Sequence, residues 1–347
     1  MLKLLRILLL PFSYLFEGII IARNFFYDKN IFKAEKVGVK VFSIGNITVG
    51  GTGKTPTVIY LVNLLKKLGQ KPGILSRGYG RKSSGYRLVF DGKRFHCDSF
   101  ECGDEIVLEA RACNVPSAVS ENRVIGAKKL ISATGINALV LDDAFQHRKI
   151  ARDFDIVLLD ENFLTQADFL DKQLLPSGIL REPFASLKRA SVIIINRKFS
   201  EAKELPVKIQ RLLKDKKVFY AHYETDGFFD VKTLKRYELT DFIGQKSLAV
   251  SGIAKPESFF ATLESLSVEI TEKLIFKDHK NYSNNDVQLI RKKFYSTNAY
   301  SVIVTEKDAV KLARFAKELD DIDIYFLRIK IALENEDEFA GMISSII

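Results

Sequence analysis

The chain has 347 residues, of which 47% are hydrophobic and 28% are charged. This composition excludes a mainly disordered or collagen-like protein, and the length fits two domains or one large α/β domain. The net charge of +10 arises in one quarter of the chain, because residues 1–82 hold 14 basic and 3 acidic residues whereas the remainder holds 39 and 40. Charge placed beside an apolar N-terminus and a glycine-rich loop favours a membrane surface and phosphates over nucleic acid.

The first 27 residues are mostly apolar and have basic residues at their edges. Their longest uncharged stretch, Ile7–Phe16, has ten residues, about half of the ~18–20 that a membrane span needs. Glu17 interrupts the apolar region and no small-residue cleavage site follows, so a secretory signal peptide is not indicated. We expect a helix that lies in a lipid interface; the alternative is a helix packed on the protein's own core.

The three cysteines, Cys97, Cys102 and Cys113, are an odd number and too few for a disulfide framework in a chain of this length. Their spacing is not that of a zinc site. We therefore expect ordinary reduced cysteines.

Beyond residue 38, apolar β-like runs alternate with helical segments such as Thr55–Leu68 and Glu121–Ala133. Several runs are rich in Val, Ile and Leu, which is typical of parallel strands buried on both faces. The alternation predicts a doubly wound α/β fold. The predicted strands are Val39–Ile47, Gly73–Ser76, Tyr86–Phe90, Ala138–Leu141, Asp155–Leu159, Val192–Ile195, Val218–His222, Leu248–Ser251, Ser301–Thr305 and Asp323–Ile331.

A charge-rich stretch near residues 200–217 separates two series of β/α segments, which predicts a large P-loop NTPase-like domain and a smaller α/β domain. The predicted division is an N-terminal membrane-associated helix at 1–35, a P-loop kinase core at 36–217, a linker strand at 218–235, the smaller domain at 236–322, and a return strand with a C-terminal helix at 323–347.

A glycine-rich loop joins the first strand to the first helix of this pattern. It matches the phosphate-binding consensus G-x-x-x-x-G-K-[ST] except at its first glycine. Glycines allow backbone N–H groups to surround phosphate oxygens, and the helix N-terminus adds its own free N–H groups. Lys54 would reach the β- and γ-phosphates of ATP, and the Thr55 hydroxyl could ligate Mg²⁺. The predicted ATP-binding residues are Thr48, Val49, Gly50, Gly51, Thr52, Gly53, Lys54 and Thr55.

Two aspartates, Asp142 and Asp143, end the apolar run Ala138–Leu141. In P-loop domains a strand beside the P-loop strand delivers an aspartate towards Mg²⁺. Adjacent residues of an extended chain point to opposite sides, so one carboxylate could serve the metal and the other a neighbouring group. The sequence does not distinguish between them.

Further candidates follow other strands and loops. Arg77 and Arg81 lie on a glycine-rich loop after the next strand, where two arginines could clamp phosphate; a basic surface turn is the alternative. Gly103-Asp104-Glu105 is predicted to begin a helix. Arg123 and the pair Arg181-Glu182 are less specific candidates, as are the lone histidines His147 and His279, for which a structural role is the commoner case.

Together these motifs resemble the tetraacyldisaccharide 4′-kinases, which phosphorylate the lipid A precursor. The matching segments occur in family order across nearly the whole chain. Ala144 and Lys280 depart from the family pattern, which has Gly and His at those places. The segments are Asn46–Pro56, Arg77-Gly-Tyr-Gly-Arg81, Gly103-Asp-Glu105, Asp142-Asp-Ala-Phe-Gln-His-Arg148, Asp155–Asp160, Leu175-Pro-Ser-Gly with Arg181-Glu-Pro183, Ser251-Gly-Ile-Ala254, Asp278-His279 and Val304-Thr-Glu-Lys-Asp308.

The resemblance implies transfer of the ATP γ-phosphate to the 4′-hydroxyl of a tetraacyldisaccharide 1-phosphate. The product would be lipid IVA, formed at the cytoplasmic face of a bacterial inner membrane by a peripheral or monotopic enzyme. It also implies two α/β/α subdomains joined by a two-stranded linker, and an N-terminal helix on the anionic membrane surface.

Residue roles are implied by the same resemblance. Asp104 would act as the base and His279 as its partner, with Lys54 on the phosphates. Thr55 and one of Asp142 or Asp143 would organise Mg²⁺. The remaining candidates, for the substrate phosphate or the transferring group, are Arg77, Arg81, Arg123, Arg181 and Glu182.

Two other classes share part of this pattern. A membrane-associated regulatory ATPase or GTPase would have the same loop and paired aspartates, and would hydrolyse nucleotide without a lipid acceptor. Asn196-Arg197 suggests a base-reading N-K-x-D element, but Phe199 occupies the position of its aspartate. A non-enzymatic peripheral membrane protein would bind no ATP, which the glycine loop disfavours.

Overall fold

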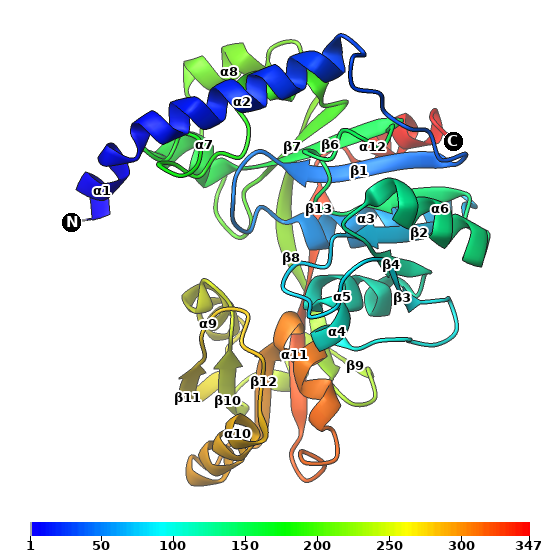
Figure 1. The fold of residues 1–347 in the computed structure, drawn as a ribbon. Coiled ribbons are helices and arrows are strands. Elements are labelled where there is room, and N and C mark those ends of the chain that lie inside the picture. The colour runs from blue at the N-terminus through cyan, green and yellow to red at the C-terminus, as the bar shows by residue number, and fades with distance from the viewer. Residues whose placement is uncertain (1) are drawn as a thin grey trace.

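The computed structural model describes residues 2–347, and a single thirteen-stranded sheet runs through them. In Figure 1 the larger domain (blue to green) lies above the smaller one (yellow to orange), and the long strands β8 and β13 connect them. The strand order is β11-β10-β12-β13-β8-β7-β6-β1-β5-β2-β4-β3, with β9 paired to β8. The two predicted domains are therefore parts of one continuous sheet.

The strands of the larger domain are β1 (Lys40–Asn46), β2 (Pro72–Ser76), β3 (Arg87–Phe90), β4 (Ser117–Val119), β5 (Ala138–Leu141), β6 (Phe154–Asp160) and β7 (Val192–Asn196). The linking and smaller-domain strands are β8 (Val218–Asp230), β9 (Arg236–Tyr237), β10 (Lys246–Ser251), β11 (Glu269–Ile275), β12 (Ser301–Thr305) and β13 (Ile324–Leu333).

The α-helices are α1 (Leu2–Leu8), α2 (Leu10–Asp28), α3 (Lys54–Lys67), α4 (Ser99–Cys102), α5 (Asp104–Cys113), α6 (Arg123–Thr134), α7 (Glu161–Gln166), α8 (Val207–Leu213), α9 (Pro256–Ser265), α10 (Asn284–Ser296), α11 (Glu306–Leu312) and α12 (Glu336–Ser344). Short 3₁₀ turns occupy Phe184–Arg189, Leu239–Phe242 and Ala313–Phe315.

The larger domain is a doubly wound layer structure. Its central strand β1 pairs in parallel with β5 on one side and with β6 on the other. Helices α3, α5 and α12 pack on one face of the sheet, and α2, α6, α7 and α8 cover the other. Val, Ile and Leu fill the strands because both faces are buried. This confirms the predicted strand beside the P-loop strand that ends in the paired aspartates.

The smaller domain repeats the pattern on a reduced scale. Its strands β10, β11 and β12 are parallel, with α10 and α11 on one face and α9 on the other. The antiparallel pair of β8 and β13 joins it to the larger domain.

The N-terminal region forms two helices rather than the expected single one. The helix is interrupted at Leu9, and Pro11 lies in the first turn of α2. A proline is tolerated there because its missing N–H would have no partner in the helix. Within residues 2–347, no helix combines the length and apolar character needed to cross a membrane.

The expectation of three reduced cysteines is wrong for two of them. Cys97 and Cys102 form a disulfide, and Cys113 is a buried free thiol. The pair encloses α4, whose N-cap Asp98 accepts hydrogen bonds from the N–H groups of Phe100 and Glu101. The turn formed by α4 brings together two cysteines whose spacing in the sequence did not predict a disulfide.

Candidate active site

The phosphate-binding loop is positioned by side chains and backbone from three other segments. The Asn46 amide donates to the Thr52 hydroxyl at 2.9 Å, and the Asn196 amide donates to the Thr52 carbonyl at 3.1 Å. Val49 N–H donates to the Ile179 carbonyl at 2.8 Å. Gly53 has φ 101°, and a Cβ there would lie 2.4 Å from the Asn196 amide nitrogen. Glycine is therefore required at this position for both conformation and space.

Lys54 and Asp143 meet at the mouth of this loop. The Lys54 ammonium lies 3.9 Å from Asp143 Oδ1, and the Arg181 guanidinium donates to both oxygens of Asp143 at 2.8 and 3.0 Å. Arg181 also donates to the Asn46 side chain and to the Thr48 carbonyl. Burial would raise the pKa of Asp143, but the Arg181 and Lys54 contacts outweigh it and lower that pKa. Asp143 is thus an ionised anchor for two cations.

Asp142 has a different environment from its neighbour. Its Oδ2 accepts a hydrogen bond from the Ser76 hydroxyl at 3.0 Å, whereas its Oδ1 is buried and has no hydrogen-bond partner in the described part of the chain. Burial, with the nearby Glu105 and Asp143 charges, raises the pKa of Asp142 to about 6. A buried carboxylate oxygen without a donor is suited to a cation, and Mg²⁺ prefers oxygen ligands. The donor set of Asp142 and the Thr55 hydroxyl therefore fits Mg²⁺ in a P-loop site, which also uses phosphate oxygens and water.

The turn after β5 explains why Ala144 is tolerated. The left-handed conformation falls on Asp143, with φ 45°, and not on residue 144. The close approach lies instead at Gly45, where a Cβ would meet Phe145 Cβ at 2.7 Å. The departure from the family pattern therefore leaves the backbone turn intact.

Asp104 is the first residue of α5, as predicted. Gly103 precedes it with φ 100°, and a Cβ at Gly103 would lie 3.2 Å from the Tyr79 carbonyl. The loop carrying Arg77 and Arg81 therefore packs directly against the start of α5. Only 8% of the Asp104 side chain is exposed.

Asp104 receives its charged partners from the smaller domain. Its Oδ2 lies 3.3 Å from His279 Nδ1 and 3.1 Å from Lys311 Nζ. Burial would raise the pKa of Asp104, but the His279 hydrogen bond and the charges of Lys311 and Lys307 hold it below its usual range. The Asp104 hydrogen bond in turn raises the pKa of His279. The structure thus brings together the two residues that the sequence proposed as a base and its partner.

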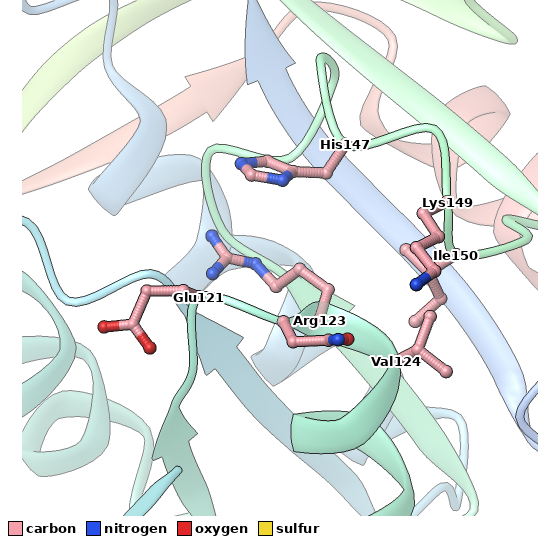
Figure 2. Close-up of a pocket in the computed structure, with 7 residues that line it drawn as sticks. Glu121, Arg123, Val124, His147, Lys149 and Ile150 are labelled. Carbon is pink, nitrogen blue, oxygen red and sulfur yellow. The ribbon is translucent and has the colours of Figure 1, made fainter. Parts of the chain in front are cut away.

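A polar cavity of about 330 Å³ opens between the start of α6 and the loop after the paired aspartates. Figure 2 shows the Arg123 guanidinium and the His147 ring facing this space. Arg123 is 3% exposed and donates to the carbonyls of Ser120 and Asp142. Burial and the charges of Arg123 and Arg77 lower the pKa of His147 to about 4, so this histidine is neutral at pH 7.

Arg81 and Glu182, like Arg123 and Arg181, are engaged with other parts of the protein. The Arg81 side chain is 3% exposed and pairs with Glu121, which also borders the cavity. Glu182 is fully buried and accepts hydrogen bonds from Arg23, Asn24 and Arg189 at 2.8 to 3.1 Å.

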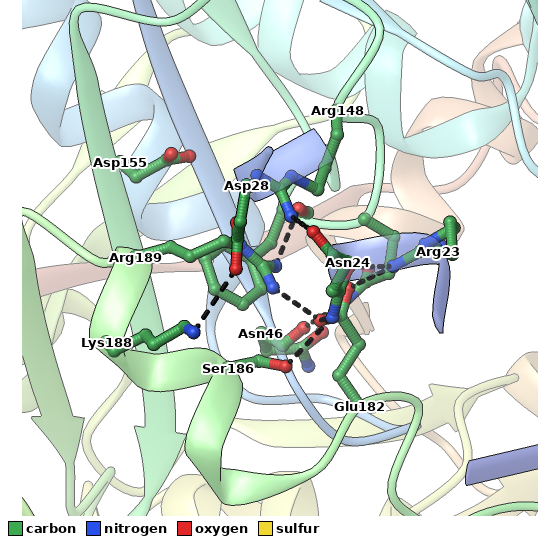
Figure 3. Close-up of polar contacts among 12 residues, drawn as sticks. Arg23, Asn24, Asp28, Asn46, Arg148, Asp155, Glu182, Ser186, Lys188 and Arg189 are labelled. Atoms are coloured by element: carbon green, nitrogen blue, oxygen red, sulfur yellow. Dashed lines mark hydrogen bonds and ion pairs between the residues drawn. The ribbon is translucent and has the colours of Figure 1, made fainter. Parts of the chain in front are cut away.

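Figure 3 shows this network beneath α2. In the loop that follows the paired aspartates, Arg148 donates to the Asn24 carbonyl and to Asp28. The neighbours Arg181 and Glu182 therefore have different partners. Arg181 binds Asp143 beside the phosphate loop, and Glu182 binds residues of α2.

Sequence reasoning missed several residues of this site. Asn196 braces the phosphate loop, and Lys307 and Lys311 contact α5 from α11. Lys307 lies in the quoted Thr-Glu-Lys-Asp motif, which offered a signal of its importance; no pattern in the chain links Lys311 to Asp104.

Comparison with known proteins identifies the family. The family model for tetraacyldisaccharide-1-P 4′-kinase matches residues 5–347. The chain belongs to this family. A tetraacyldisaccharide 4′-kinase of Syntrophus aciditrophicus is 36% identical over 97% of this chain and 92% of its own length. One of Chlorobium limicola is 33% identical over 98% and 97%. The "apo" form of LpxK from Aquifex aeolicus in complex with ATP superposes with a TM-score of 0.83 at 33% identity, covering 99% of both chains.

The family membership confirms the predicted activity and fold. The chain is an ATP-dependent kinase of lipid A biosynthesis with a P-loop NTPase-like fold, and its acceptor is a lipid disaccharide. This favours the kinase over the regulatory ATPase or GTPase. The roles of individual residues remain predictions.

Proposed function

We propose that the kinase transfers the γ-phosphate across the gap between the phosphate loop and the start of α5. The observation that carries this proposal is that Lys54 and the unpartnered oxygen of Asp142 follow the adjacent parallel strands β1 and β5, and that the charge of Glu105, the neighbour of Asp104 on α5, acts on Asp142. The acceptor 4′-oxygen would form a bond to the γ-phosphorus as the bond to the bridging β,γ-oxygen breaks, and the 4′-hydroxyl proton would pass to Asp104.

The loop residues have defined tasks in this proposal. The loop N–H groups and Lys54 would bind the β- and γ-phosphates, with Lys54 leaving Asp143 to Arg181. Asp142 and Thr55 would hold Mg²⁺, which when bound neutralises charge on the phosphates. An Asp104 carboxylate of low pKa is a weak base, but in a loose transition state the proton can leave late and orientation matters more. His279 would provide that orientation.

The cavity of Figure 2 suits the phosphate of the acceptor. Arg123 and Lys149 line it, and the charge of Arg77 reaches its His147 wall. A phosphate could also draw Arg81 away from Glu121, since a dianion outcompetes an exposed carboxylate. Because Glu182 is fully buried against α2, we assign it a role in positioning that helix rather than in contacting substrate.

One transfer assay tests the reaction and separates it from its rival. The protein is incubated with Mg-ATP carrying a labelled γ-phosphate and a detergent-dispersed tetraacyldisaccharide 1-phosphate. Label in the lipid is expected, and it should disappear in Lys54→Met and fall in Asp104→Asn. Label only in free phosphate would contradict the kinase assignment and favour a regulatory ATPase.

We also propose that α1 and α2 rest on an anionic membrane surface at the cytoplasmic face. One face of α2 is buried through Ser13, Ile20 and Asn24. Most of the large apolar side chains elsewhere on both helices are exposed, and a helix of this kind inserts its apolar face into the headgroup region. The most exposed of them are Leu4, Leu8, Phe12 and Leu15.

Sedimentation with vesicles tests this surface. The triple variant Leu8→Ser, Phe12→Ser, Leu15→Ser should lower binding to phosphatidylglycerol vesicles at least ~10-fold, given ~1.5–3 kcal/mol for each apolar side chain withdrawn from water. A matched control changes two exposed apolar residues of the smaller domain, Ile243→Ser and Tyr300→Ser. Equal loss in the control, or none in the triple variant, would contradict the assignment.

A further inference from the structure

The smaller domain presents its charged residues to Asp104 from a rigid base. Asp308, in the first turn of α11, is fully buried. Its Oδ1 accepts a hydrogen bond from the Tyr282 hydroxyl at 3.0 Å, and its Oδ2 accepts from Gly252 N–H at 2.9 Å and from the Thr305 hydroxyl at 2.7 Å. Tyr282 lies three residues after His279, at the end of the same loop. Asp308 therefore fixes α11 and that loop relative to each other.

From this base, two lysines one helical turn apart contact two successive acidic residues of α5. Lys311 Nζ lies 3.1 Å from Asp104 Oδ2, and Lys307 Nζ lies 2.6 Å from Glu105 Oε1. The two pairs differ in burial. The Lys311 and Asp104 side chains are 7% and 8% exposed, whereas those of Lys307 and Glu105 are 32% and 29% exposed.

Burial gives the Lys311 contact its importance. A lysine ammonium removed from water is costly unless an opposite charge compensates it. Lys311 pairs with Asp104, which lies in the other domain. If the domains separated, the Lys311 ammonium and the Asp104 carboxylate would each lose its opposite charge. Their pairing therefore favours the docked arrangement, in which His279 also contacts Asp104.

The two oxygens of Asp104 are used unequally. Lys311 and His279 both contact Oδ2, whereas within residues 2–347 Oδ1 accepts only from the N–H of the next residue, Glu105, at 3.1 Å. Two donors on Oδ2 fix the plane of the carboxylate and leave Oδ1 as the oxygen available to a hydroxyl of the acceptor.

We propose that Lys311 is a positioning residue for phosphoryl transfer, which holds the Asp104 carboxylate in one orientation through Oδ2 when the smaller domain docks. This inference rests on the proposed role of Asp104 as the base. The charged groups facing Asp104 are Lys311 and Lys307 from α11 and His279 from its loop, with Glu105 on the helix of Asp104 itself.

The test compares Lys311→Met, which keeps the length of the side chain, with Lys311→Arg, which keeps the charge. Lys293→Met is the control, because Lys293 is a lysine of the smaller domain that pairs with Glu272 at 2.6 Å. In Lys311→Met we expect kcat to fall ~10–100-fold with the KM for ATP unchanged within about twofold. Lys311→Arg should recover most of kcat, and Lys293→Met should leave kcat unchanged.

A double-variant cycle separates this proposal from the assignment of Asp104. If Lys311 acts through Asp104, adding Lys311→Met to Asp104→Asn should lower kcat no further. A further loss equal to that in the wild-type background would overturn the role of Lys311, as would unchanged kcat in soluble, folded Lys311→Met. Full turnover in Asp104→Asn alone would instead overturn the proposed base. If Lys311→Met does not fold, Lys311→Gln replaces it in the same cycle, and additive losses of kcat would overturn the role of Lys311.

Discussion

The two sides of the candidate active site are built in different ways. On the larger domain, the phosphate loop is held by neighbours within the same domain, such as Asn46, Asn196 and Arg181. On the smaller domain, Asp308 fixes a group of cations whose partners lie in the other domain. The first side can therefore be formed before any substrate arrives, whereas the second completes the site only through docking.

The comparison suggests a division of labour. A preformed loop can bind nucleotide without the smaller domain, because its N–H groups are already oriented. Catalysis requires Asp104 and His279 together, and their contact depends on the interface between domains. A kinase assembled in this order would limit transfer of phosphate to water before the lipid is in place.

The largest expected effect is at the junction of the two sides. Asp104→Asn should lower kcat by ~10²–10⁴, the usual scale of general-base catalysis, while ATP binding changes little. Steady-state transfer assays and equilibrium nucleotide binding measure the two quantities. Comparable losses of kcat and ATP affinity would mean that the two sides are not separable.

The second effect concerns the buried network around Glu182, which holds α2 on the larger domain. Glu182→Gln would leave Arg23 and Arg189 without a buried anion, which should cost ~3 kcal/mol in the free energy of unfolding measured by urea. The Arg189 and Arg23 contacts outweigh burial and lower the pKa of Glu182 from 4.5. Because the folded pKa is depressed, the stabilisation is present above the unfolded pKa and is lost as the pH falls through the folded one.

Glu35→Gln is the matched control for this change, since Glu35 forms an exposed pair with Lys128 at 3.2 Å. A surface pair of this kind contributes ~1 kcal/mol or less. Equal unfolding free energies for the two variants would show that the network beneath α2 is not needed for stability.

The third effect distinguishes the paired aspartates. Asp142→Asn should raise the Mg²⁺ concentration for half-maximal activity ~10–100-fold, as expected for loss of a metal contact. Burial raises the pKa of Asp142, so protons should compete with Mg²⁺ for its carboxylate and Mg²⁺ activation of the wild type should weaken as the pH falls. Asp143→Asn should mainly raise the KM for ATP, because Arg181 loses its partner. The reverse pattern would assign Asp143 to the metal.

The smallest effect is expected at the base of the docking side. Asp308→Asn keeps the size of the side chain but weakens its hydrogen bonds to Tyr282, Gly252 and Thr305. We expect kcat to fall ~3–10-fold with unchanged ATP affinity, because bonds to a charged acceptor are worth ~1.5–3 kcal/mol and the fold retains part of them. Loss of ATP affinity in this variant would contradict the independence of the phosphate loop.

Much of the preformed side could be predicted from the sequence because it is encoded locally. A strand, a glycine loop and a helix follow one another directly. The position with positive φ, residue 53, is a glycine, which adopts this conformation without strain. The start of α5 after Gly103 could be read for the same reason. The edge strand β11 was not predicted because its mixture of charged and apolar residues follows no strict alternation, and β4 was not predicted because it has three residues.

The sequence alone determined the P-loop, the paired aspartates at a strand end and the α/β class, since each depends on neighbouring residues and on the burial pattern of single elements. Only the tertiary structure decided which partner each charge has: Arg181 for Asp143, α2 for Glu182, and Lys311 for Asp104. The contact of Lys307 with Glu105 joins residues 202 positions apart. Such pairs arise from the docking of whole elements, and the preferences of the local chain contain no information about them.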